Sequence, residues 1–502
     1  MTSLSLRFFP RTGRPLLLAG LAVALTACAS SRGLEPRGTL LDADTLHGER
    51  TLSTAMLGAA GFPAHDWWRA LGDPQLDALV AEGLASHPSL DAADARLRQA
   101  RAQVGGARAD QLPSVSASGG YTGVRLPESM LGDELGGHYG GSSRLMLNVS
   151  YGVDLWGGKR AAWEAAVDSA HAADIDAQAA RLNLSAGIAQ AYVSLAYAWQ
   201  LQDVAEEERV RSQRSLELTR QRRAAGIDSE LQVRQAEGRV PAAQQQWQAA
   251  QQQIDEARTA LAALMGKGPD RGQQIQRPKT LEPMALQLPG VLPSALLGRR
   301  PDIVAARWRV EAAGRQIDAA KAAFYPSLNL TALAGVVAPN LGDLLQSSSS
   351  FAYLGPALSL PVFDGGRLRA GLDRRDAEFD LAVASYNQAV LDALREVADE
   401  VTAVQSLQQQ AQSQQQAVDI ARAAFELADQ RYRAGIGNYL DVLTAQSTLL
   451  QSQQRLAGLK SQQVLSSVRL SQALGGGFEP SPNALPRTAS LSDSTKSLKT
   501  SP

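Results

Sequence analysis

The residue types that carry most enzyme chemistry are few and poorly spaced in this chain. Its five histidines show no His-x-x-x-His or similar spacing that would give a catalytic metal its ligands: His47, His65, His87, His138 and His171. No nucleophile-elbow motif with Ser/His/Asp partners is present either. The single cysteine, Cys28, excludes an intrachain disulfide and a thiolate metal cage. We therefore expect neither an enzyme nor a metal site.

The context of Cys28 indicates a different chemistry. Three arginines (Arg7, Arg11 and Arg14) precede an apolar run over 16–25, which ends in Leu25-Thr26-Ala27-Cys28. A basic start followed by a short apolar run is typical of a secretory signal. The Leu-x-Ala-Cys ending resembles the lipobox of bacterial lipoproteins, in which the cysteine receives a diacylglycerol. We expect a signal peptide over 1–27 and a covalent lipid on Cys28 as the only cofactor; the alternative is an ordinary cleavage site beside an incidental cysteine.

The charge balance and the internal repetition limit the classes of protein that remain possible. With 49 Lys+Arg against 50 Asp+Glu, the chain lacks the basic surplus that nucleic-acid binding needs. Its 502 residues would ordinarily predict several globular domains. However, one motif occurs twice, 209 positions apart: Arg222 and Ala225-Gly226-Ile227 correspond to Arg431 and Ala434-Gly435-Ile436. The chain therefore consists of two copies of one unit.

Each copy is dominated by long helical segments. Residues 159–225 and 367–434 contain no proline and run for 67 and 68 residues. Each could form a helix about 100 Å long. Apolar residues in the second run recur in steps of three and four, which indicates a coiled-coil seam. Shorter helices are predicted over 88–111, 228–265, 301–324 and 438–474, with a local bend at Pro241.

Two strands are predicted between the short and the long helix of each copy. The clearest covers 145–155, where apolar and polar residues alternate strictly; the others cover 113–125, 326–337 and 352–363. Gly/Ser-rich segments at 132–143 and 339–350 are expected to be loops. Alternation over about ten residues suits a strand between lipid and water. Four strands cannot close a transmembrane barrel, for which about eight is the minimum, so the barrel must be shared between chains.

This combination resembles the outer membrane factor family, the TolC/OprM-type exit ducts, and its lipoprotein branch. Family-like stretches include Trp67-Trp68, Asp73-Pro74-Gln75-Leu76, the segment 92–102 and Arg431-Tyr432-Arg433-Ala434-Gly435. The resemblance implies a mainly α fold with a transmembrane β part. It implies a homotrimer with a 12-stranded barrel, four strands from each chain, continued by a periplasmic α-helical tube.

The resemblance also assigns site residues at the far ends of the helix hairpins. Ala225, Gly226 and Ile227, with Ala434, Gly435 and Ile436, would form the periplasmic tips where an adaptor docks. Asp441 would line the closed constriction, where three copies form a cation-selective ring. Tyr432 matches a tyrosine that bonds to the neighbouring hairpin, but its usual acidic partner is replaced by Gln232. The alternatives are that Asp441 is an ordinary solvated residue and Tyr432 an ordinary seam residue.

The resulting hypothesis is a passive outer-membrane channel of a tripartite efflux system. It would receive substrate from an inner-membrane pump of resistance-nodulation-division type through a periplasmic adaptor. The rival hypothesis is a lipid-anchored periplasmic coiled-coil scaffold without a pore. The expected organisation is a signal peptide (1–27), an anchored N-terminal segment (28–86), repeat 1 (87–266), a linker (267–299), repeat 2 (300–475) and a disordered tail (476–502).

Overall fold

The computed structural model describes residues 30–42, 62–284 apart from 126, 128, 130–136 and 138, and 298–479. The described chain forms two compact units, each built from both repeats. The strand unit comprises residues up to 40 together with 98–172 and 306–386; the hairpin unit comprises 41–97, 173–305 and 387 onward. Cys28, the signal peptide over 1–27 and residues 480–502 lie outside the described residues.

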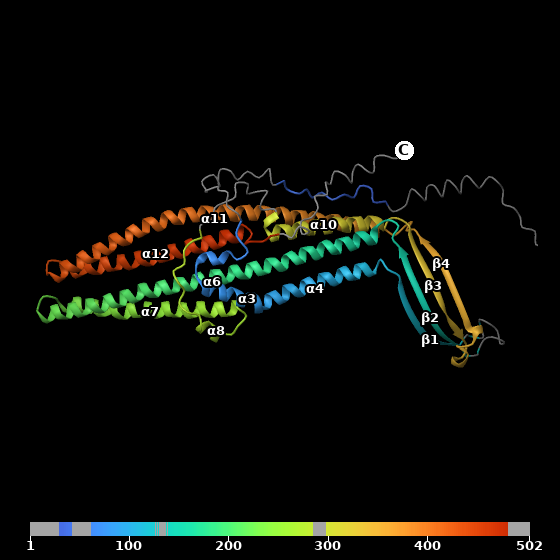
Figure 1. Cartoon of the computed structure of the whole chain (residues 1–502), viewed down its shortest axis with the longest axis horizontal. Helices are drawn as coiled ribbons and strands as arrows, with labels where there is room; N and C mark the ends of the chain where they lie inside the picture. Colours follow the sequence, from blue (N-terminus) through green and yellow to red (C-terminus); the bar gives the residue numbers. More distant parts are fainter. Residues whose placement is uncertain are drawn as a thin grey trace, which may run out of the picture. The chain divides into compact units, whose positions relative to one another are not determined.

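The strand unit is built on one antiparallel sheet in the order β1-β2-β3-β4 (Figure 1). The strands are β1 (Ser114–Arg125), β2 (Tyr139–Val153), β3 (Ser327–Ala338) and β4 (Ser350–Ser359). The edges of β1 and β4 have no partner strand among the described residues, as expected if other copies of the chain complete the barrel. The prediction of a loop over 132–143 was wrong in its second half, because β2 already begins at Tyr139. That error reflects the weak strand propensity of its glycines and serines.

The six longest helices among the described residues belong to the two repeats. In chain order they are α4 (Pro88–Ala109), α6 (Gly158–Ala224), α7 (Glu230–Leu264), α10 (Pro301–Ala322), α11 (Arg367–Arg433) and α12 (Tyr439–Ala473). The two long helices, α6 and α11, have 67 residues each. The order α4-β1-β2-α6-α7 thus recurs as α10-β3-β4-α11-α12. Helix α7 continues through Pro241. No described helix is both long and apolar enough to span a lipid bilayer.

The main core lies in the hairpin unit, beside the middle of α6. The 3-10 helix η3 (Trp67–Leu71) and helix α3 (Pro74–Ser86) pack there with α7, and the short helix α8 (Pro269–Gln273) contacts α7. Asp73 caps α3 by accepting from the Gln75 amide, and it also accepts from the Tyr192 hydroxyl (2.6 Å). Although burial opposes ionisation, these hydrogen bonds lower the pKa of Asp73. The stretch around Asp73 therefore anchors the core to α6.

Candidate gate and hairpin tips

The two hairpin tips share one turn geometry. Gly226 follows α6 with φ 74° and Gly435 follows α11 with φ 76°, a left-handed conformation that glycine adopts without strain. The next amide closes each turn, from Ile227 to the Arg222 carbonyl (2.9 Å) and from Ile436 to the Arg431 carbonyl (3.0 Å). The return helices are then capped by Ser229 and Asn438.

Both tips present apolar side chains to solvent. Ile227 is 60% exposed and Ile436 is 70% exposed, and Leu231 and Leu440 beside them are also exposed. These four residues occupy equivalent positions in the two repeats. Clustered exposed apolar side chains mark an interaction surface. Each predicted tip residue therefore lies where a partner could contact it.

A buried polar cluster joins the two tips within one protomer. Tyr432, at the end of α11, is 1% exposed, and its hydroxyl donates to the carboxylate of Asp228 in the first tip. Arg222 pairs with the same carboxylate (3.0 Å) and donates to the Tyr432 carbonyl oxygen (2.7 Å). Its guanidinium also lies 4.3 Å from the centre of the Tyr432 ring. We call Arg222, Asp228 and Tyr432 the tip clasp.

The electrostatics of the tip clasp favour a neutral tyrosine and a charged pair. Burial, together with the hydrogen bond to Asp228, raises the pKa of Tyr432 to about 12. Hydrogen bonding to Asp228 raises the pKa of Arg222 although burial opposes this. Tyr432 therefore remains a hydrogen-bond donor throughout the physiological pH range, and the clasp is held by a charge-assisted network.

Within the described chain, Gln232 caps the helix in whose first turn it lies. Its side-chain oxygen accepts from the Ser229 amide (2.5 Å) and hydroxyl (2.7 Å), which forms the capping box of α7. Asp228, four residues earlier, supplies the acceptor for Tyr432 instead. Sequence reasoning missed Asp228 because it compared aligned positions only. The signal was an acid directly after the Ala-Gly-Ile turn.

Asp441 lies in the first turn of α12 with an exposed side chain. Its backbone amide donates to the Asn438 carbonyl (3.2 Å), which continues the cap. The equivalent first turn of α7 carries Glu230, which pairs with Arg223 (2.5 Å) and Arg234 (2.8 Å). Among the described residues Asp441 has no such basic partner. Its charge is thus the more available of the two for a pore.

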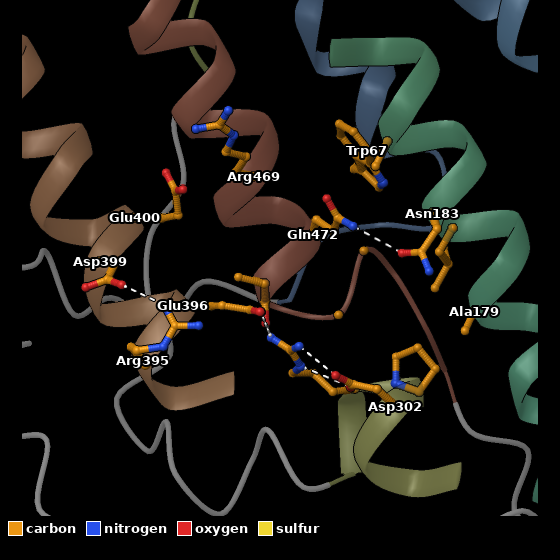
Figure 2. A pocket seen from close by; sticks show the side chains of 17 residues that line it. Trp67, Ala179, Asn183, Asp302, Arg395, Glu396, Asp399, Glu400, Arg469 and Gln472 are labelled. Atoms are coloured by element: carbon orange, nitrogen blue, oxygen red, sulfur yellow. Dashed lines mark hydrogen bonds and ion pairs between the residues drawn. The ribbon is translucent and has the colours of Figure 1, made fainter. Parts of the chain in front are cut away.

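A second polar site, which sequence reasoning did not identify, lies where α12 ends and α10 begins (Figure 2). A cavity of about 460 Å³ opens there beside α6 and α11. Arg300, 8% exposed, bridges Asp302 (2.7 Å), Glu396 (2.8 Å) and the Ala473 carbonyl oxygen (3.1 Å). Arg300 therefore joins the end of α12, the start of α10 and the side of α11.

The four-stranded sheet with open edges, the paired long hairpins and the apolar tips define the class: one subunit of an outer-membrane duct. The sequence profile of the "Outer membrane efflux protein" family matches residues 79–267 and 292–476. The chain belongs to this family.

Similar proteins agree in name and in structure. The chain is 40% identical over 382 residues to the fusaric acid resistance protein FusA of Burkholderia cepacia, covering 73% of this chain and 70% of that one. It is 33% identical to the multidrug resistance outer membrane protein MdtP of Escherichia coli, covering 94% and 96%. The crystal structure of VceC from Vibrio cholerae superposes with TM-score 0.77 at 37% identity, over 83% of this chain and 100% of VceC.

These findings confirm the family, the fold class and the efflux-channel function. Proteins of this family form trimeric channels in the outer membrane and work with a periplasmic adaptor and an inner-membrane pump. The family is one of channels rather than enzymes. The lipid on Cys28, the gate roles of Asp441, Tyr432 and Gln232, the docking role of the tips, the domain boundaries and the pump class stay predictions.

Proposed function

We propose that this chain forms a passive exit duct that is closed at rest by its hairpin tips and opened by an adaptor. The tip clasp carries the proposal, because it ties the first hairpin to the second through one buried carboxylate. An adaptor that binds the splayed tips more tightly than the closed ones shifts the channel toward the open state. No covalent step is needed, and the pump supplies the energy.

The exposed tip residues are the proposed adaptor contacts. Ile227 and Ile436 would insert into apolar grooves on the adaptor, with Ala225, Gly226, Ala434 and Gly435 keeping the turns narrow. Gln232 would act indirectly, by holding the start of α7 beside Asp228. The pump would be of the resistance-nodulation-division type.

A lipid on Cys28 would add a membrane anchor to the barrel. Support comes from the described segment that follows it. The carboxylate of Asp380 on α11 accepts from the Arg37 amide (2.8 Å) and the Gly38 amide (2.6 Å). The segment leading from the cysteine is therefore fixed along α11. Intact-protein mass spectrometry of wild type and Cys28→Ser tests this; identical masses for the processed chains, apart from the substitution itself, would exclude lipidation.

The transported solutes would include organic acids. The relative that is 40% identical is named for resistance to fusaric acid, which is an organic acid. Another, 33% identical, is named as a pyoverdine export protein of Pseudomonas aeruginosa, so the relatives serve different solutes. Selection among solutes would lie largely with the pump.

The docking step is tested by charged substitutions at the tips. Ile227→Glu combined with Ile436→Glu should abolish efflux in a strain that carries the cognate pump and adaptor, while trimers and bilayer conductance persist. Ile420→Glu is the matched control, since Ile420 is equally exposed (70%) but lies on the side of α11. Unchanged efflux in the double variant would refute tip docking.

A further inference from the structure

The two faces of the sheet differ in polarity. Because directly opposite residues share a face, Leu145, Leu147 and Val149 of β2 lie beside Val336, Ala334 and Ala332 of β3. On the other face, Asn148 and Ser150 lie opposite Ser116 and Ser114 of β1. We call these the lipid face and the pore face.

Aromatic side chains support this assignment. Tyr121 and Tyr139 lie on the lipid face near the β1–β2 loop, each folded over a glycine of the neighbouring strand. At the opposite end of the lipid face lies Tyr151, opposite Leu330. Aromatic residues flanking an apolar band mark the two membrane interfaces of such barrels. The stretch of β2 between Tyr139 and Tyr151 thus lies at membrane depth.

Arg144 lies within this stretch on the pore face. It is opposite Gly120 of β1 and Val337 of β3. A side chain at Gly120 would meet it, since an added Cβ would lie 3.4 Å from the guanidinium Nε. The arginine side chain therefore lies across the sheet beside Gly120. On the lipid face at this depth an arginine would be strongly destabilising, so its place on the pore face is the favourable one.

The charge of Arg144 is not balanced within the sheet. The four strands contain no acidic residue, and their only other charged residue is Arg125, at the loop end of β1 opposite Tyr139. Within the described residues the guanidinium of Arg144 has no ion-pair partner. A second cation, the Lys159 ammonium, lies near the helix end of the pore face and donates to the Gly152 carbonyl oxygen (2.8 Å).

We propose that Arg144 forms an anion-binding ring in the barrel, where three copies attract carboxylate-bearing solutes. The proposal rests on the trimeric channel described above and adds a solute-selecting site to it. Rings of basic side chains favour anions in a pore. The planar guanidinium can also hold a carboxylate through two parallel hydrogen bonds. The ring's preference for anions would be opposite to the preference for cations that is expected of an acidic ring at Asp441.

Reversal potentials of the purified full-length trimer in planar bilayers under a KCl gradient test the proposal. Arg144→Gln should lower the chloride-to-potassium permeability ratio on the order of threefold, from the loss of one charge per chain near the pore. The same comparison is made in an Asp441→Asn background, so that the charge of Asp441 at the tip does not hide the effect of Arg144 in the barrel. The matched control is Arg125→Gln, which removes one arginine of the same hairpin from the lipid face. Its permeability ratio should equal that of wild type.

Current block by sodium benzoate tests the carboxylate site itself. Arg144→Lys should keep the chloride-to-potassium permeability ratio of wild type but weaken benzoate block, because lysine keeps the charge and loses the paired hydrogen bonds. Equal permeability ratios and equal block in wild type and Arg144→Gln, in both backgrounds, would overturn the proposal while leaving the channel intact. A wild-type trimer without conductance would instead overturn the channel function.

Discussion

The hydroxyl of Tyr432, at the end of the second long helix, donates to the carboxylate of Asp228 in the tip of the first hairpin. The two residues lie 204 positions apart in the sequence. Because Arg222 neutralises the same carboxylate, the contact is buried without leaving an isolated charge. The two hairpins of one protomer are thus held together at the end that we propose to open.

Tyr432→Phe should weaken the closed state of the channel. It removes one buried hydrogen bond to a charged acceptor, about 1.5–3 kcal/mol, so the ratio of open to closed channels should rise roughly tenfold or more. Single-channel recording in planar bilayers measures this ratio. Tyr439→Phe is the control, since the tilted ring of Tyr439 lies beside that of Tyr432 (5.3 Å between ring centres) but its hydroxyl pairs with the neutral Ser215. Equal open probability in wild type and Tyr432→Phe would show that the clasp does not close the pore.

Asp441→Asn should reduce the preference of the channel for cations. It removes three negative charges from the proposed constriction in a trimer, where a charged ring acts at close range. The reversal potential under a KCl gradient reports the change. Glu230→Gln is the matched control because Arg223 and Arg234 already neutralise Glu230. If both variants retain the selectivity of the wild type, Asp441 is an ordinary solvated residue.

Arg300→Ala should destabilise the junction between α12 and α10. It leaves the buried Ala473 carbonyl oxygen without its donor and the half-exposed Glu396 without its ion-pair partner, which costs about 1–3 kcal/mol. Arg395→Ala, in the same cavity, removes a more exposed arginine that pairs only along α11, and should cost about 0–1 kcal/mol. Thermal unfolding followed by circular dichroism compares the two. A similar melting temperature for both variants would contradict the bridging role.

Relative to the variant Asp168→Asn, the wild-type fold should be more stable in mild acid than at neutral pH. Burial, with Glu311 and Glu164 nearby, raises the pKa of Asp168 to about 6 although Arg315 opposes the shift. A carboxyl with a raised pKa holds its proton more tightly in the folded state. Its contribution to the free energy of unfolding therefore falls as the pH rises from about 4 to about 6.

The variant Asp168→Asn should consequently gain about 1–2 kcal/mol over wild type at pH 7.5 and lose most of that gain at pH 4.5. Thermal unfolding at the two pH values checks this. A gain for Asp168→Asn that is the same at both pH values would exclude the titration of Asp168 as its cause.

Most of the elements could be predicted from the sequence, because their signals are local. The proline-free runs correspond to α6 and α11 within two residues at each end, and the alternation over 145–155 lies within or just beyond β2. Helix α3 carried a signal that was not used, since Asp73 followed by Pro74 is a typical helix start. Local pattern failed at Tyr139, where pairing with Arg125 extends β2 into a segment rich in glycine and serine.

The candidate site could be predicted only in part, because its contacts join distant segments. The tips were found from the repeated Ala-Gly-Ile, which is a local turn motif. Asp228 and Arg300 could not be assigned, since their roles depend on residues about 100 to 200 positions away. For Gln232, the position in the sequence implied a gate role, which stays a prediction, but it did not reveal the helix cap that its contacts form.

Three copies of this chain are expected to enclose a conducting pore. The most direct measurement combines gel migration of the purified full-length protein, with and without heating, with its current in planar bilayers. We expect a trimer that dissociates on heating and inserts with discrete, reproducible conductance steps. A monomer that produces no conductance would refute the channel and would favour a lipid-anchored scaffold.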